Sequence, residues 1–212
     1  MNNSKEALSF DSLLGRIVDA FNKKNISFCI LRNSDISWTN GDDIDVLLYH
    51  LDLDSAVSEI SNIISSIKYA SLMFDKQVDF HRHLFIIFYD ELTNENKMLV
   101  IDLQVGIIEN DTVFFLADDV LIYKKETELI PRLDSSMEGL LMLIHSIFGK
   151  RKFNRNYWEI LVRINSDNSK KLFNVLLLVF KESISLLIIE SLKSNDQLSI
   201  LSISHTDLVP QI

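Results

Sequence analysis

The 212-residue chain has a mass of 24.5 kDa, which suits one full-sized domain or one domain with a helical appendage. With 47% hydrophobic residues it can bury a substantial core, and its single cysteine, Cys29, excludes an intrachain disulfide framework and a cysteine-based zinc site. The 30 acidic and 21 basic residues give a net charge of −9, which argues against a general electrostatic grip on duplex nucleic acid or an anionic membrane.

The first half of the chain alternates between helical and strand-like periods. Apolar residues at helical spacing predict a helix over residues 5–24, and an apolar run predicts a buried strand over 27–31 that includes Cys29. A polar loop over 32–41 leads into a second predicted strand over 44–49. Asp52 or Asp54 can cap the next helix, whose apolar face runs from Val57 to Ile67.

A hairpin is expected next along the chain. Residues 78–89 and 98–105 are strand-like, the turn-forming sequence Asn94-Glu95-Asn96 separates them, and a further short strand fits residues 112–116. The order helix–strand–strand–helix–strand–strand predicts an α/β (α+β) fold with a mixed sheet and flanking helices.

The second half predicts helices only. Ser135 and Glu138 match a capping box, Gly149 is expected to end the helix that they start, and further helices are expected over 155–165 and 169–193. Residues from 195 onward give a weak signal. We therefore expect an α/β domain over residues 1–132 and a C-terminal helical domain over 133–212.

Two carboxylates open the second predicted strand. Asp43 and Asp45 stand at alternate positions, so they project from the same face of that strand, while Ile44 and Val46 face the other way. Two carboxylates held this close repel each other, and a divalent cation between them relieves the repulsion. The alternative is that Asp42 and Asp43 are turn residues after Gly41 and that Asp45 is solvated at a strand edge.

A third acid, Asp102, lies inside the apolar strand over 98–105. An Asp in such a strand costs several kcal/mol unless it is paired, hydrated or metal-bound. If this strand neighbours the one over 44–49, Asp102 completes a triad with Asp43 and Asp45. Three such acids suit two Mg²⁺ ions, which align an attacking hydroxyl and stabilise both oxygens of a phosphoryl transfer.

The order of helix, apolar strand, loop, Asp-x-Asp and later strand Asp resembles the nucleotidyltransferase fold typified by DNA polymerase β. The closer similarity is to bacterial nucleotidyltransferase-like proteins with "Leu-Arg … Gly-Asp-Asp-Ile-Asp", which often occur near surface-polysaccharide genes or fused to kinase-like domains. The matching segments are Ile30-Leu31-Arg32, Gly41-Asp42-Asp43-Ile44-Asp45-Val46-Leu47 and Ile101-Asp102-Leu103, with a weaker match over 140–152 and at Tyr157.

The resemblance implies a nucleotidyltransferase that uses Mg²⁺ or Mn²⁺ to transfer a nucleoside monophosphate from an NTP to a hydroxyl of a sugar or other small molecule. It makes Asp43 and Asp45 ligands of both metal ions in a two-ion site. Asp102 would bind the catalytic metal and help to deprotonate the acceptor hydroxyl. Two alternatives stay open: a binding or regulatory module of the same fold that has lost catalysis, and an α/β scaffold whose acids are incidental.

The chain departs from the active members of this group after the first strand. Asn33-Ser34 stand where those members carry Gly-Gly or Gly-Ser, whose backbone N–H groups cradle the triphosphate. We therefore expect the triphosphate to be bound by the metal and by Arg32, with a hydroxyl donated by Ser34. Lys152, in the basic run 150–152, is a further candidate for binding substrate phosphate.

Each of these side chains also has a structural alternative. Arg32 can pair with Asp42 or Asp43, and the basic run can be a solvated helix end. His81 and His83 share one strand face and could contact substrate, although two histidines without a third ligand are poor evidence for zinc and surface positions are the alternative. His145, in an apolar helix, is expected to be a satisfied core histidine.

The N-terminal residues lack a basic region followed by an apolar core, and Lys181-Glu182 end the most apolar run at Phe180. We therefore expect no secretory signal, no membrane-spanning helix and a cytoplasmic location. The apolar density of residues 172–192 predicts a homodimer through the C-terminal helices.

Overall fold

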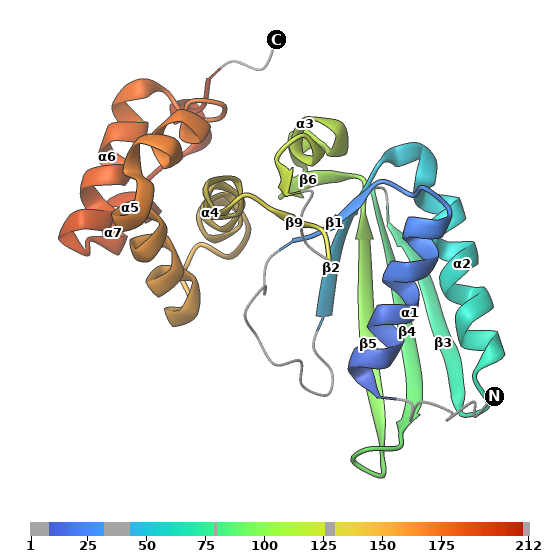
Figure 1. Cartoon of the computed structure of the whole chain (residues 1–212). Coiled ribbons are helices and arrows are strands. Elements are labelled where there is room, and N and C mark those ends of the chain that lie inside the picture. The colour runs from blue at the N-terminus through green and yellow to red at the C-terminus, as the bar shows by residue number, and fades with distance from the viewer. Residues whose placement is uncertain (1–8, 32–42, 79, 126–129, 210–212) are drawn as a thin grey trace. The chain divides into compact units, whose positions relative to one another are not determined.

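The computed structural model describes residues 9–31, 43–78, 80–125 and 130–209. The chain forms two compact units (Figure 1). Unit 1 comprises Met1–Gly106 and Leu116–Arg132, and unit 2 comprises Ile107–Phe115 and Leu133–Ile212. The predicted independence of residues 1–132 and 133–212 as separate domains stays a prediction.

Seven strands of the described chain form one mixed sheet in the order β3-β4-β5-β2-β1-β9-β8. The pairs β3–β4, β4–β5 and β2–β1 are antiparallel, whereas β5–β2 and β1–β9 are parallel. The strands are β1 Phe28–Ile30, β2 Asp43–Leu48, β3 Ala70–Val78, β4 His81–Asp90, β5 Glu95–Gln104, β8 Lys124–Lys125 and β9 Arg132–Leu133.

Helices α1 (Phe10–Lys23) and α2 (Leu53–Ser66) cover one face of the large strands (Figure 1). Their buried residues pack against every second residue of β2, β4 and β5, such as Ile44, Leu84 and Ile101. Because side chains alternate across a strand, the residues between these positions point to the other face of the sheet. The helices therefore leave that second face to the polar side chains described below.

The helices and strands predicted for the first half are confirmed with small changes of bounds, but β3, β8, a strand over residues 106–109 and a helix over residues 117–121 were not predicted. Residues 70–78 form β3, which the sequence pattern did not indicate, because most of its residues are exposed and its register shifts between Leu72 and Phe74. The predicted cap of α2 is right in position only, because Asp52 is the N-cap residue. Asp52 makes no side-chain cap, and its carboxylate instead accepts a hydrogen bond from the backbone N–H of Ser27 at 2.9 Å.

Unit 2 is mostly helical. The hairpin strands β6 (Gly106–Glu109) and β7 (Thr112–Leu116) pair with each other, and the short helix α3 (Ala117–Leu121) of unit 1 follows them in the chain. The helices of unit 2 are α4 Ser135–Ile144, a π-helix His145–Lys150, α5 Arg155–Leu176, α6 Glu182–Ser194, α7 Gln197–Leu201 and the 3₁₀ turn His205–Asp207.

Three details of the helical half differ from the sequence prediction. The cap of α4 is Asp134, whose side chain accepts from Ser136, so the predicted capping box is wrong. Gly149 lies inside the π-helix, where a Cβ would collide with the carboxylate of Glu109, and Arg151 is the left-handed cap at φ 54°. The helix predicted over 169–193 is interrupted between α5 and α6.

The architecture is thus a mixed α/β sheet flanked by helices, followed by a C-terminal helical segment, as the sequence predicts. None of the helices that the structure describes combines the length and the hydropathy needed to cross a bilayer.

Candidate functional site

Strand β2 places its two aspartates on the sheet face that α1 and α2 leave uncovered. Ile44 and Val46 are buried in the core beneath those helices, at 0% and 5% exposure. Asp43 is exposed and Asp45 is partly exposed on the opposite side. The alternation expected from the sequence is therefore present, and Asp43 and Asp45 share one face.

Asp102 lies directly beside Asp45. The parallel strands β2 and β5 pair with Asp45 opposite Asp102 and Asp43 opposite Val100. Side chains in register on neighbouring strands point to the same face, so Asp43, Asp45 and Asp102 share one face of the sheet, with Asp45 and Asp102 as direct neighbours. The Asp102 side chain is 13% exposed, while its neighbours Ile101 and Leu103 pack in the core.

Gln104 links the two inner carboxylates. Its Nε2 donates to Oδ1 of Asp45 at 3.0 Å and to Oδ2 of Asp102 at 2.8 Å, and the residue is only 5% exposed. Hydrogen bonds to a charged acceptor contribute about 1.5–3 kcal/mol each, so this amide holds both carboxylates in place. Sequence reasoning missed Gln104, although its position two residues after Asp102 puts it on the same strand face.

Two histidines of β4 complete the cluster. The register sets His83 opposite Asp102 and His81 opposite Gln104. Nδ1 of His83 lies 3.3 Å from Oδ1 of Asp102, and Nδ1 of His81 lies 3.4 Å from both oxygens of that carboxylate. The imidazole rings stack with centroids 6.0 Å apart, and their side chains are 24% and 32% exposed for His81 and His83.

The sequence also named Arg32, Ser34 and Lys152 as substrate-binding residues. Arg32, Ser34 and Asp42 lie outside the described residues. Lys152 belongs to unit 2, where it is exposed and its backbone N–H donates to the carbonyl of Ser146. The roles assigned to Arg32, Ser34 and Lys152 stay predictions.

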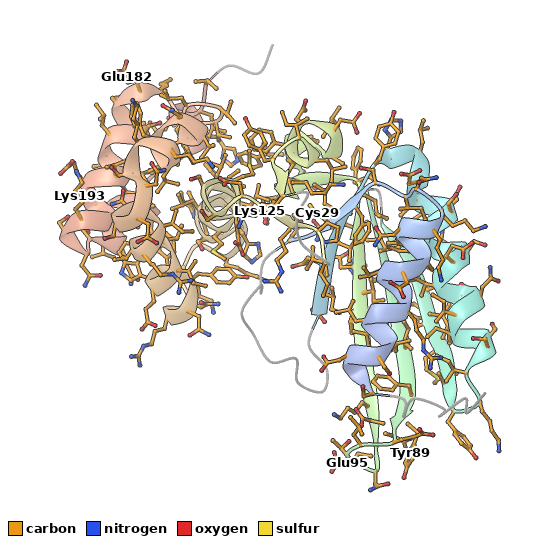
Figure 2. The ribbon with its side chains drawn as sticks, viewed as in Figure 1. Cys29, Tyr89, Glu95, Lys125, Glu182 and Lys193 are labelled. Carbon is orange, nitrogen blue, oxygen red and sulfur yellow. The ribbon has the colours of Figure 1, made fainter. Side chains whose placement is uncertain are left out.

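Two other chemically capable side chains are accounted for by burial or by a structural partner. Burial raises the pKa of Cys29 to about 12, so this thiol of β1 (Figure 2) stays protonated and is no nucleophile at neutral pH. His145 in unit 2 has its Nδ1 2.6 Å from Oε1 of Glu109, so it is satisfied as expected, although its side chain is 20% exposed and not fully in the core.

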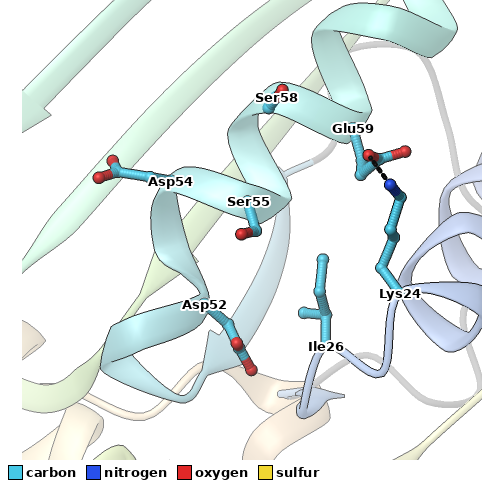
Figure 3. A pocket seen from close by; sticks show the side chains of 7 residues that line it. All are labelled: Lys24, Ile26, Asp52, Asp54, Ser55, Ser58 and Glu59. Atoms are coloured by element: carbon cyan, nitrogen blue, oxygen red, sulfur yellow. Dashed lines mark ion pairs between the residues drawn. The ribbon is translucent and has the colours of Figure 1, made fainter.

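A surface pocket of unit 1 lies by the N-terminal turns of α2, among Lys24, Ile26, Asp52, Asp54, Ser55, Ser58 and Glu59 (Figure 3). Its one ammonium, on Lys24, is paired with Glu59 at 3.4 Å. The pocket is lined by α2 and by the chain that follows α1, whereas the aspartates lie on the sheet face that these helices leave uncovered. It is therefore separate from the carboxylate cluster.

No protein-family model matches the chain, and the curated proteins contain no match either. Two crystal structures resemble it over most of their length. JHP933 from Helicobacter pylori is 11% identical with a TM-score of 0.46, over 97% of both chains. A candidate nucleotidyltransferase from H. pylori is 11% identical with a TM-score of 0.48, over 95% of this chain and 99% of that one. Structural similarity at this level is not evidence of a shared function.

The chemistry of the site therefore rests on its own side chains. Three carboxylates offer the hard oxygen ligands that Mg²⁺ and Mn²⁺ prefer, and the two imidazoles offer nitrogen ligands next to them. The amide of Gln104 fixes two of the carboxylates. Such a face can hold divalent cations and accept a proton.

Proposed function

We propose that the chain is a metal-dependent nucleotidyltransferase that transfers a nucleoside monophosphate from an NTP to a hydroxyl of a sugar or other small molecule. One observation carries the proposal: Asp45 and Asp102 are register partners on neighbouring parallel strands, and Asp43 stands two residues away on the same face. Because the NTP donor is made in the cytoplasm, the proposal locates the protein there.

The donor set fits Mg²⁺ or Mn²⁺. Asp43, Asp45 and Asp102 are three oxygen ligands on one sheet face, and Asp43 is exposed, so substrate phosphates can reach the same place. When bound, the metal supplies charge stabilisation to the transferring phosphoryl group.

Within the proposal, each residue of the chain has a separate task. Asp43 and Asp45 hold the metal from one strand. Asp102, on the neighbouring strand, also receives the proton of the acceptor hydroxyl, because it is a partly buried carboxylate beside the metal ligands. Gln104 keeps Asp45 and Asp102 at a fixed separation, which limits the reorganisation needed when substrate binds.

A binding or regulatory module without catalysis is the alternative function. It is favoured by the number of protein partners that Asp102 already has: the amide of Gln104 and the imidazoles of His81 and His83. A carboxylate with this many partners is stable without any metal.

A metal-dependent stability measurement separates the two functions. Ligand binding to the folded state alone raises stability by about 2.7 kcal/mol at one hundred times the Kd. We expect Mn²⁺ to raise the melting temperature of the wild-type protein, and Asp45→Asn to abolish this shift. Asp19→Asn is the matched control, since Asp19 is exposed on α1 and should leave the shift unchanged.

Turnover completes the test. With Mg²⁺, NTP and a panel of sugars, the enzyme releases pyrophosphate, and Asp45→Asn does not. A Mn²⁺ shift and nucleotide binding without pyrophosphate release would support the binding module instead. If Mn²⁺ raised the melting temperature of wild type and Asp45→Asn equally, both the enzyme and the metal-dependent binding module would be ruled out.

The substrate contact assigned to Arg32 is tested by titration with ATP, GTP, CTP and UTP in Mg²⁺. Because a hydrogen bond to a charged group contributes about 1.5–3 kcal/mol, Arg32→Ala should weaken NTP binding by about tenfold or more. Arg32→Lys should restore only part of the affinity, since an ammonium cannot form the bidentate contact. Tight NTP binding that persists in EDTA would contradict the proposal that the metal and Arg32 bind the triphosphate.

A further inference from the structure

His81, His83 and Asp102 form a compact three-ligand cluster on the open sheet face. Each can offer one ligand atom, and these atoms all lie within 4.8 Å of one another. The strands fix this arrangement: His81 and His83 alternate along β4, and His83 is the register partner of Asp102 on β5. The grouping is therefore imposed by backbone pairing rather than by flexible side chains meeting by chance.

The distances match those between ligands of one metal ion. Around a tetrahedral ion with bonds of about 2.05 Å, neighbouring ligand atoms stand about 3.3 Å apart. The Nδ1 atoms of His83 and His81 lie 3.3 and 3.4 Å from Oδ1 of Asp102. Both imidazoles therefore stand at ligand spacing from Asp102, and all three ligand atoms lie within 4.8 Å of one another.

The second oxygen of Asp102 is already oriented. Gln104 donates to Oδ2 at 2.8 Å, and Oδ1 takes the short contact to His83. Metal ligands held by such outer hydrogen bonds bind more tightly, because the carboxylate does not have to be ordered when the ion arrives.

We propose that His81, His83 and Asp102 form a binding site for a borderline divalent cation of the Zn²⁺ or Fe²⁺ class. Two imidazoles disfavour Mg²⁺ and Ca²⁺, which take oxygen ligands, and favour first-row transition metals. Three protein ligands leave coordination positions open, and the side chains are partly exposed, so water or a substrate oxygen can complete the sphere. The site shares Asp102 with the proposed catalytic carboxylates but needs neither nucleotide nor catalysis.

Zn²⁺ is the first probe. Isothermal titration of the full-length protein in excess Mg²⁺ should show one Zn²⁺ bound per chain at this cluster. His83→Gln and His81→Gln should each weaken that binding by about tenfold or more. His50→Gln is the matched control: His50 is exposed on a 3₁₀ turn of the same unit, and its removal should change nothing.

Two further measurements keep this proposal separate from the proposed function. Asp43→Asn should keep full Zn²⁺ affinity, because Asp43 is not in the cluster, even if all metal-dependent turnover is lost. Co²⁺ bound to the wild-type protein should give visible d–d absorption that His83→Gln removes. The proposal is overturned if Zn²⁺ does not bind in excess Mg²⁺, or if the two histidine variants bind it as the wild type does.

Discussion

Asp45 and Asp102 are direct partners in the parallel pairing of β2 and β5, and one amide nitrogen, on Gln104, donates to both of them. Two like charges side by side on neighbouring strands destabilise a sheet. Gln104 offsets that repulsion, since it is buried and delivers a hydrogen bond to each carboxylate. The protein can therefore keep the two acids close before any cation binds.

Replacing Gln104 by Glu should reveal this arrangement. The variant loses both hydrogen bonds, worth about 1.5–3 kcal/mol each, and adds a further carboxylate at a buried position. We expect the free energy of unfolding at pH 7 to fall by about 3 kcal/mol or more in urea denaturation. Mn²⁺ should stabilise this variant more than the wild type, because it adds an oxygen ligand.

Gln77→Glu is the control for the charge change. Gln77 is exposed on the edge strand β3, so the same substitution there should alter stability by less than about 0.5 kcal/mol. Equal urea midpoints for the two variants would show that the Gln104 amide contributes nothing.

The common face of Asp43 and Asp45 was predictable, because it depends only on the two-residue period of a strand. Their proximity to Asp102 could not be predicted outright. It requires β2 to pair with β5, which lies more than fifty residues further along the chain. The same pairing, with β4 on the other side of β5, brings His81 and His83 to Asp102. Long-range register of this kind leaves no local signal in the sequence.

Other differences arise where local rules are overridden. Strand β3 lacks a clear apolar alternation, because it is the edge of the sheet and is mostly exposed. Gly149 suggested a helix end, but its missing side chain instead makes room for Glu109. Both residues of that contact belong to unit 2 and are far apart in sequence, so composition alone could not pair them.

Asp90 provides a prediction about pH. It is 2% exposed at the start of the β4–β5 turn, and Tyr89 and Glu95 mark that end of the hairpin (Figure 2). Burial raises the pKa of the Asp90 carboxyl, but the backbone N–H groups of Thr93 and Leu92 and the ammonium of Lys97 outweigh it and lower the pKa.

A lowered pKa in the folded state fixes the sign of the effect. The stabilisation is fully present above the unfolded pKa of about 3.9 and is lost as the pH falls through the folded pKa. Asp90→Asn should therefore reduce the free energy of unfolding by about 2 kcal/mol at pH 7, and the difference should shrink below about pH 4. Urea denaturation over a pH series from neutral to acid measures it, and a difference independent of pH would refute the assignment.

Asn195 tests the helical unit. It ends α6 in the left-handed region at φ 60°, and its Oδ1 accepts a hydrogen bond from the indole N–H of Trp158. Asn195→Ala should cost about 3 kcal/mol, because it loses this bond and strains the backbone. Asn195→Gly should cost about half as much, since glycine tolerates the backbone conformation. Thermal unfolding compares them, and equal losses would mean that the backbone contributes nothing.

Self-association is the remaining prediction, and it depends on the leucines that the helical unit leaves exposed. Leu177 and Leu178 are 38% and 43% exposed, and Leu186 and Leu187 of α6 are 49% and 38% exposed. Glu182 and Lys193 mark the two ends of α6 (Figure 2). Helices that are apolar on more than one side are stabilised by burial against another chain.

We expect light scattering at micromolar protein to give twice the 24.5 kDa mass of one chain. The double substitution Leu186→Glu and Leu187→Glu should give the monomer mass without unfolding α6, because its buried side, which includes Ile188 and Leu192, is unchanged. Leu51→Glu is the control, since Leu51 is 69% exposed in unit 1 and should leave the dimer intact. A wild-type protein with the mass of one chain would contradict the dimer, and a dimer that survives the double substitution would place its interface elsewhere.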